Sequence, residues 1–148
     1  MAGIAQVTQG GPKTFTPADN EVILGGLLVE ARAGGRIGVA AAGSTKVLGV
    51  ALTDALAPED FPAADGTDAL GRTVVSAVPV PTTVAVAYGG TEVKVTYSAA
   101  ATFGDKLVAT AGGKVGPAGA TPDARTIVGI CTEPAGVAAN ARGLIRLA

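Results

Sequence analysis

Short apolar runs separated by glycine-containing turns fill the chain from residue 22 onward. The runs in the first third are residues 27–29, 37–39 and 47–50, and each is bounded by glycine or polar residues. Runs of this length, broken in this way, are typical of β-strands joined by tight turns. In residues 92–97, valine and tyrosine alternate strictly with charged and polar residues, which predicts a strand with one buried and one solvated face. The pattern therefore predicts an all-β fold.

Three further strands are expected between residues 73 and 97, with a fourth at the C-terminal end. Residues 83–88 and 91–97 flank Gly89-Gly90, which predicts a hairpin. Residues 73–78 form the preceding strand, and Pro79 and Pro81 mark a sheet edge or a strand switch, because proline cannot donate to a ladder. The last strand, residues 144–147, is expected to pair back into the sheet.

An internal similarity links two parts of the chain roughly 80 residues apart. Residues 28–50 contain Leu-Val, then Ala-Gly-Gly-Arg-Ile-Gly, then Val-Leu-Gly-Val, and residues 107–130 contain Leu-Val, Ala-Gly-Gly-Lys-Val-Gly and Ile-Val-Gly-Ile. We interpret each copy as a hairpin whose Gly-Gly pair supplies the positive φ angles of a primed turn. Two copies are too few for a solenoid and indicate two similar halves of one barrel or sandwich.

The ends of the pattern suggest the domain organisation. Residues 1–14 lack periodicity and carry one charge, Lys13, so they are expected to form a flexible N-terminal arm. Residues 15–148 are assigned to a single β-barrel domain, which suits the length of the chain. Within it lies an acidic loop from Asp54 to Asp68, in which Pro58 and Pro62 argue against regular structure beyond a brief turn.

Composition agrees with short strands and a thin core. Hydrophobic residues make up 48% of the chain but aromatics only 3%, so each buried side chain contributes little area. The chain has 22 glycines and 9 prolines, and these cost about 1 and about 3 kcal/mol in a helix interior. The single cysteine, Cys131, lies in a β-like apolar run and is expected to be buried.

Candidate catalytic groups are scarce. The chain has no histidine, which removes the commonest general base and metal ligand. Ser44 and Lys46 are spaced for a dyad but are interpreted as part of a polar loop. Gly112-Gly113-Lys114 lacks the Ser or Thr and the first glycine of a phosphate loop. We expect no enzymatic activity, no catalytic residues and no cofactor.

Binding motifs for ions and small ligands are equally weak. Residues 65–68, Asp-Gly-Thr-Asp, lack the further acids of a calcium loop, so no metal site is expected. Tyr88 and Tyr97 near the Gly89-Gly90 turn are better explained by packing than by stacking on a sugar or base.

Charge and hydropathy argue against two classes of partner, nucleic acids and membranes. The formal net charge is -1, with acids and bases spread along the chain, so nucleic acid is a poor candidate. No secretory signal begins the sequence and no apolar stretch reaches the length of a membrane span. We expect no membrane partner and synthesis in the cytoplasm.

The order of motifs resembles the capsid decoration (cement) proteins of tailed bacteriophages and related particles. The motifs that carry the resemblance are Gly25-Gly26-Leu27-Leu28-Val29, Val47-Leu48-Gly49-Val50-Ala51, Phe103-Gly104-Asp105-Lys106-Leu107-Val108, Ile127-Val128-Gly129-Ile130 and an arginine-bearing last strand. They are turn-and-strand signatures and span roughly residues 15 to 148. The acidic loop is a departure from the usual members.

The resemblance implies a compact β-barrel or β-tulip that assembles as a trimer. It also implies a place on the outer surface of the virion, where the protein binds the major capsid protein at junctions between subunits and stabilises the head. The alternatives are a carbohydrate-binding or adhesive β-module, for which exposed aromatics are few, and another structural component of the virion. The residues expected to contact the partner are Ile4, Val7, Lys13 and Phe15.

Overall fold

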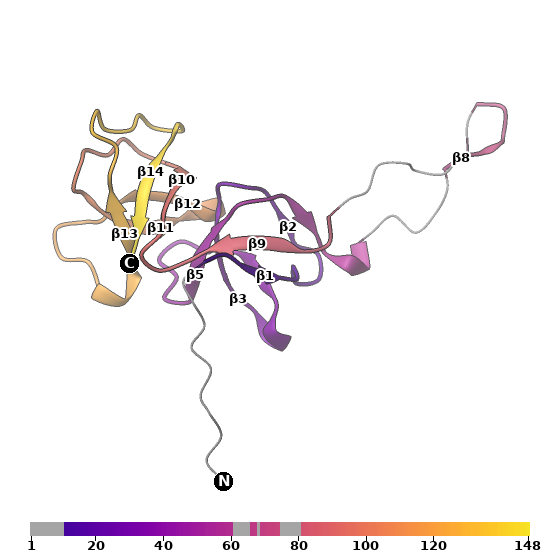
Figure 1. Ribbon diagram of the computed structural model, residues 1–148, viewed down its shortest axis with the longest axis horizontal. Helices are drawn as coiled ribbons and strands as arrows, with labels where there is room; N and C mark the ends of the chain where they lie inside the picture. Colours follow the sequence, from indigo (N-terminus) through magenta and orange to yellow (C-terminus); the bar gives the residue numbers. More distant parts are fainter. Residues whose placement is uncertain (1–10, 61–65, 68, 75–80) are drawn as a thin grey trace, which may run out of the picture.

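The computed structural model describes residues 11–60, 66–67, 69–74 and 81–148, and within them two five-stranded antiparallel sheets (Figure 1). The first sheet has the order β1-β9-β5-β3-β4. Its strands are β1 (Lys13–Phe15), β3 (Leu28–Ala31), β4 (Ile37–Val39), β5 (Val47–Ala51) and β9 (Val84–Ala87). The second sheet has the order β10-β14-β13-β11-β12. Its strands are β10 (Glu92–Thr96), β11 (Lys106–Thr110), β12 (Lys114–Pro117), β13 (Ile127–Cys131) and β14 (Arg142–Leu147).

Smaller elements complete the described part of the chain. Two strand pairs lie outside the main sheets: β2 (Val22–Ile23) with β6 (Ala55–Leu56), and β7 (Gly66–Thr67) with β8 (Thr73–Val74). Four short 3-10 turns are present: η1 (Ala33–Gly35), η2 (Pro58–Asp60), η3 (Ala111–Gly113) and η4 (Ala124–Thr126). None of these helical turns is long and apolar enough to cross a membrane.

The all-β prediction is confirmed, but the predicted closed barrel is not found. In each sheet the edge strands are joined only through one isolated parallel bridge, Pro17 with Ile37 in the first and Tyr97 with Val115 in the second. A single bridge does not continue a ladder along two strands, so each sheet remains open. The strand signals in the sequence specify local extension and do not specify closure.

The predicted internal repeat is confirmed for the Gly-Gly turns and for the strands after them, and it extends to the whole sheet. The predicted match of the two Leu-Val pairs is displaced by one residue, because the ladders make Val29 the counterpart of Leu107 and Leu28 that of Lys106. The strands β3 and β11, each next to an edge strand of its sheet, pair with the next strand in sequence and with the one after it, in the same register. The paired residues are Val29 with Val39 and Gly49, and Leu107 with Pro117 and Gly129. Both strands shift register directly after this point. The duplication therefore covers strand order, pairing and the bulge.

The glycine in the repeated Val-Leu-Gly-Val and Ile-Val-Gly-Ile motifs has a steric cause. A Cβ atom on Gly49 would overlap the carbonyl oxygen of Ala87, and one on Gly129 would overlap that of Arg146. Both glycines lie beside the register shift, where the neighbouring strand approaches closely. The similarity in sequence thus marks the same close backbone contact in each sheet.

The Gly-Gly turns differ from the primed hairpin that was predicted. Gly34, Gly35, Gly112 and Gly113 all have φ between 70° and 72°, so the expected positive φ is confirmed. However, both pairs lie at the end of a 3-10 turn, η1 or η3, and not at the centre of a two-residue turn. The preceding alanine takes part in that turn, which lengthens the loop.

The predicted Gly89-Gly90 hairpin is wrong. β9 and β10 belong to different sheets, and the glycines join them as a crossover. β9 pairs instead with β1 and β5, and β10 pairs with β14. The edges of β9 and β10 that a hairpin would have paired with each other are therefore occupied by strands distant in sequence. The prediction that the last strand pairs back into a sheet is confirmed by β14.

Two clusters of buried side chains form the core. The first lies within the first sheet and the β2-β6 pair. The second combines the interior of the second sheet with residues of the first, including Leu28, Val50 and Ala87, and so connects the two halves that lie beside each other in Figure 1. Cys131 is fully buried in it, as predicted, and Val95 and Tyr97 face inward while Glu92 and Lys94 are exposed.

The predicted arm boundary requires a correction. Lys13 and Thr14, placed in the arm, are part of β1 and pair with Val86 and Ala85. The strand begins before the first apolar residue because its partner β9 supplies the ladder. Residues 1–10 lie outside the described residues, as do Asp65 and Asp68 of the acidic loop and the end of the predicted strand over residues 73–78.

Candidate partner-binding surface

Polar residues considered as candidate catalytic or metal-binding groups make hydrogen bonds and ion pairs within the fold. The Ser44 Oγ accepts a hydrogen bond from the backbone N–H of Lys46 at 3.1 Å, which is the polar loop expected from the sequence. Glu59 accepts from the Arg36 guanidinium, with 2.8 Å between Nη1 and Oε2. Within the described ranges no group of three or more histidine, cysteine, aspartate or glutamate residues is close enough to hold a metal ion.

The two tyrosines do not form a common stacking surface. Tyr97 is fully buried, and its hydroxyl donates to the carbonyl oxygen of Leu144 at 2.8 Å. Burial, together with the neighbouring Cys131, raises the pKa of Tyr97 well above its ordinary value of 10. Tyr97 therefore stays protonated and packs in the core. Tyr88 is half-buried and has a different environment.

Lys13 and Phe15, two of the residues expected to contact a partner, lie on β1. The Lys13 ammonium stands 5.2 Å from the centre of the Tyr88 ring, a cation–π arrangement. Phe15 is half-buried and packs against the first core cluster. The structure brings these two residues together at one pocket, whereas Ile4 and Val7 lie outside the described residues.

That pocket has a volume of about 150 Å³ and a largely apolar lining: Lys13, Phe15, Leu48, Val86 and Tyr88. Small-molecule sites occupy about 300–1,000 Å³, so the pocket is better matched to one side chain than to a cofactor. We name it the β1 pocket. It lies where three strands of the first sheet meet, β1, β5 and β9, and Leu48 on its rim is exposed.

Sequence reasoning did not select Leu48 or Val86, although the repeat contains a signal for this site. The positions of the second sheet that correspond in the repeat to the lining of the β1 pocket are Val93, Val95, Val128, Ile145 and Leu147. These aliphatic residues belong to the second core cluster or pack against it. Lys13 and Tyr88 replace two of them in the first sheet, so a polar rim appears where the other copy is filled.

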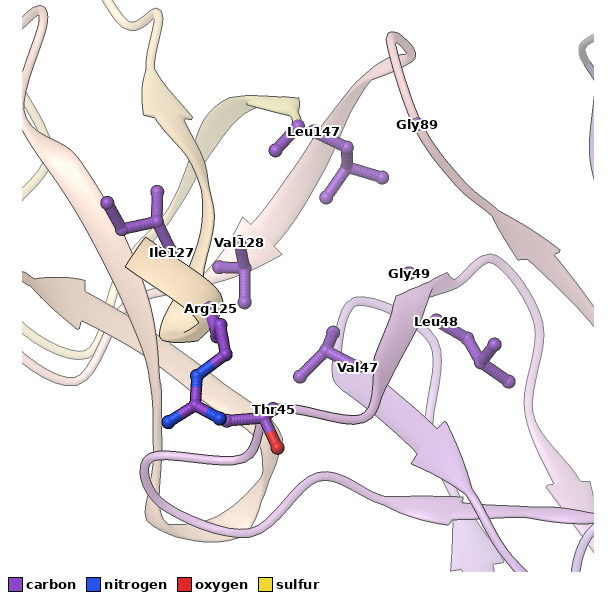
Figure 2. A pocket seen from close by; sticks show the side chains of 10 residues that line it. Thr45, Val47, Leu48, Gly49, Gly89, Arg125, Ile127, Val128 and Leu147 are labelled. Carbon is purple, nitrogen blue, oxygen red and sulfur yellow. The ribbon is translucent and has the colours of Figure 1, made fainter. Parts of the chain in front are cut away.

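A second, smaller pocket of about 90 Å³ lies between the two halves (Figure 2). Val47, Leu48 and Gly49 of β5 face η4, β13 and the end of β14 across it. The one charged side chain on its lining, Arg125, is already paired with Asp123 at 2.7 Å. The pocket is too small for a substrate, and it results from imperfect packing between the halves.

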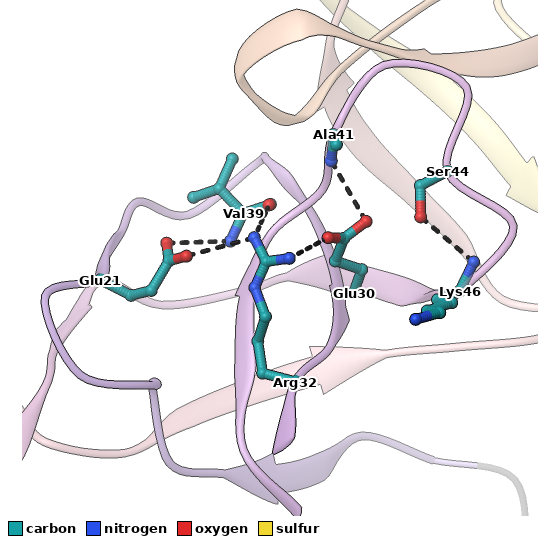
Figure 3. A network of polar contacts seen from close by, with 7 residues as sticks. All are labelled: Glu21, Glu30, Arg32, Val39, Ala41, Ser44 and Lys46. Carbon is teal, nitrogen blue, oxygen red and sulfur yellow. Dashed lines mark hydrogen bonds and ion pairs between the residues drawn. The ribbon is translucent and has the colours of Figure 1, made fainter.

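A polar network fixes the loop after β4 (Figure 3). The Glu30 carboxylate is buried, pairs with Arg32 and accepts from the Ala41 N–H at 3.2 Å. Burial opposes its ionisation, but hydrogen bonds from Ser44 and Ala41 and the charges of Arg32 and Lys46 hold the pKa of Glu30 below its ordinary value. Arg32 also reaches Glu21 and the carbonyl oxygen of Val39. The network is structural.

Exposed apolar side chains gather near a third pocket. Val22 and Leu24 are 57% and 51% exposed and border a hollow of about 160 Å³ whose lining also includes Leu56 and Pro81. Apolar groups in a shallow hollow of this kind suit contact with another protein.

Comparisons with known proteins bear on the fold of the chain. No protein-family model matches the chain, and no curated protein matches it. Among solved structures, the chain is similar to the head fiber gp8.5 N base of bacteriophage phi29, with a TM-score of 0.58 and 18% sequence identity. The match covers 93% of this chain and 95% of that one. At this identity the likeness establishes a shared fold.

Proposed function

We propose that this chain is a non-enzymatic structural protein of a tailed-phage head, which binds the outer capsid surface at junctions between major capsid subunits and stabilises it. The fold likeness to the head fiber base of bacteriophage phi29 carries the proposal, because it spans nearly the whole of both chains. The motifs that resemble cement proteins support it independently, since they were identified from the sequence.

The surface features are compatible with binding a large partner. The pockets are small and shallow, and Val22, Leu24 and Leu48 are exposed beside them. Protein interfaces use such apolar groups with a polar rim. The proposed contacts are Lys13 and Phe15 at the β1 pocket, together with Ile4 and Val7 from the N-terminal segment.

A homotrimer is part of the proposal. The core contains many alanine and valine side chains, and a symmetric oligomer would bury further apolar surface. A threefold junction between capsid subunits would match that symmetry.

A second candidate is that the chain is the base of a head fibre, because the similar structure is described as one. Both roles require head binding and differ in whether a further filament is attached. A carbohydrate-binding module is less well supported, because Tyr97 is buried and unavailable for stacking.

Co-sedimentation tests the proposal. Purified chain is mixed with heads of the phage that encodes it, prepared without this protein, and then centrifuged. The proposal predicts saturable binding and greater resistance of the loaded heads to heat or chelation. Absence of binding at micromolar chain concentration would exclude it. A glycan array separates the adhesive alternative, which predicts specific sugar binding by the isolated chain.

A further inference from the structure

The outer face of the second sheet carries cations that the fold does not neutralise. Arg146 of β14 is paired in register with Ile130 of β13, and Ile130 is paired with Lys106 of β11. Residues directly opposite in a ladder share a face, so these three form one row across the sheet. Lys94 lies on the same face of β10, and Lys94, Lys106 and Arg146 are all exposed. Glu92 lies opposite Arg146 in the ladder and places one negative charge on the same face.

The other basic residues of the described ranges interact with groups of the chain. The Lys13 ammonium stands over the Tyr88 ring, and the charge of Lys46 helps to lower the pKa of Glu30. Arg32, Arg36 and Arg125 form ion pairs. Lys114 and Arg142 donate hydrogen bonds to Asn140 and Gly25, respectively. By contrast, Lys94, Lys106 and Arg146 take part in no ion pair or hydrogen bond between described side chains. The uncompensated positive charge is therefore concentrated on one sheet face.

The internal repeat shows what this face does in the other copy. The equivalent row of the first sheet is Leu28, Val50 and Ala87, paired in the same order. These residues are 0%, 0% and 2% exposed and belong to the core cluster that includes the second sheet. The same face of the repeat is thus an interface in one half, and an open, positively charged surface in the other.

We propose that this basic face, defined by Lys94, Lys106 and Arg146, is a docking surface for an acidic protein surface. Lysine and arginine side chains at the rim of an interface pair with carboxylates and accelerate association through long-range attraction. The identification of that acidic surface with the capsid rests on the proposed function. Nucleic acid fits the face less well, because Glu92 lies in the row and the strands β10, β11, β13 and β14 contain no aromatic residue for base stacking.

The test compares two variants with the same loss of charge. The face variant is K94Q/K106Q/R146Q, and the control is R36Q/K46Q/R125Q, whose positions lie elsewhere on the surface. Melting temperatures establish that both are folded. Binding is measured for soluble poly-L-glutamate, for duplex DNA and for phage heads, each at several salt concentrations.

The proposal predicts that the face variant binds poly-L-glutamate and heads at least about fivefold more weakly than the unmodified chain, with a smaller salt dependence, while the control changes less than about twofold. Equal behaviour of the two variants, or no binding of poly-L-glutamate by the unmodified chain, would overturn it, and the charges would then serve solubility alone. DNA binding that only the face variant loses would also overturn it in favour of nucleic acid. If the unmodified chain fails to bind heads, the proposed function fails and the polyglutamate result decides the acidic docking surface on its own.

Discussion

A Cβ atom on Gly113 would lie 2.8 Å from the carbonyl oxygen of Leu28, which means that the turn of the second copy fits against the first sheet only as glycine. Its counterpart Gly35 has nearly the same φ, 72° against 70°, but nothing lies within 4 Å of its Cβ position. The duplicated turn has therefore acquired a packing role in one copy alone.

Gly113→Ala should consequently destabilise the protein more than Gly35→Ala. Both substitutions place alanine at a positive φ, at a cost of about 1–2 kcal/mol. Overpacking against Leu28 and Val39 adds about 1–3 kcal/mol for Gly113. Denaturant unfolding of the two variants measures the difference, and equal losses would show that the halves do not meet at this turn.

Tyr97→Phe tests the buried hydroxyl. Loss of its bond to the Leu144 carbonyl should cost about 0.5–1.5 kcal/mol at neutral pH. Because burial raises the pKa of Tyr97 above its ordinary value of 10, the unfolded chain ionises first as the pH rises. The contribution of the Tyr97 hydroxyl to the free energy of unfolding is therefore fully present below pH 10 and is lost as the pH rises above it. The phenylalanine variant should therefore lose less stability than the original chain between neutral and alkaline pH, and parallel pH profiles would contradict this.

Glu30→Gln tests the network of Figure 3 in acid. The pKa of Glu30 is held below its ordinary value of 4.5, so its contribution is present above that pH and is lost as the pH falls through the lowered value. We expect the substitution to cost about 1 kcal/mol at pH 7 and to flatten the acid limb of the stability curve. Thermal melts from pH 7 down to pH 3 measure both effects. An unchanged acid limb would exclude a role for this carboxylate.

Cys131 should react with thiol reagents only when the chain unfolds, because its side chain is fully buried in the core cluster shared by the two sheets. The labelling rate should rise with denaturant in parallel with unfolding. Rapid labelling in buffer alone would show that this part of the core opens locally.

The repeat was readable from the sequence because it depends on residues with local causes. Gly49 and Gly129 each avoid a carbonyl oxygen, and the Gly-Gly pairs adopt positive φ. Glycine therefore recurs at the positions where both copies have the same backbone conformation or close contact. The alternation around Val95 is likewise local and was predicted correctly.

Pairing between distant segments was not readable in this way. Nothing near Gly89-Gly90 indicates that β9 pairs with Lys13–Phe15 and β10 with a strand at the end of the chain. The β1 pocket depends on that same pairing, because β1 and β9 place Lys13 and Phe15 beside Val86 and Tyr88, while Leu48 comes from β5. The basic face depends on register across four strands. Sequence patterns specify the strands of such sites, and the long-range ladder brings their residues together.

Electron cryomicroscopy of heads with and without the protein tests the central claim most directly. The account predicts extra density on the outer capsid surface at junctions between subunits, large enough for both sheets, when the chain is present. Heads that give identical maps after incubation with saturating chain would contradict it.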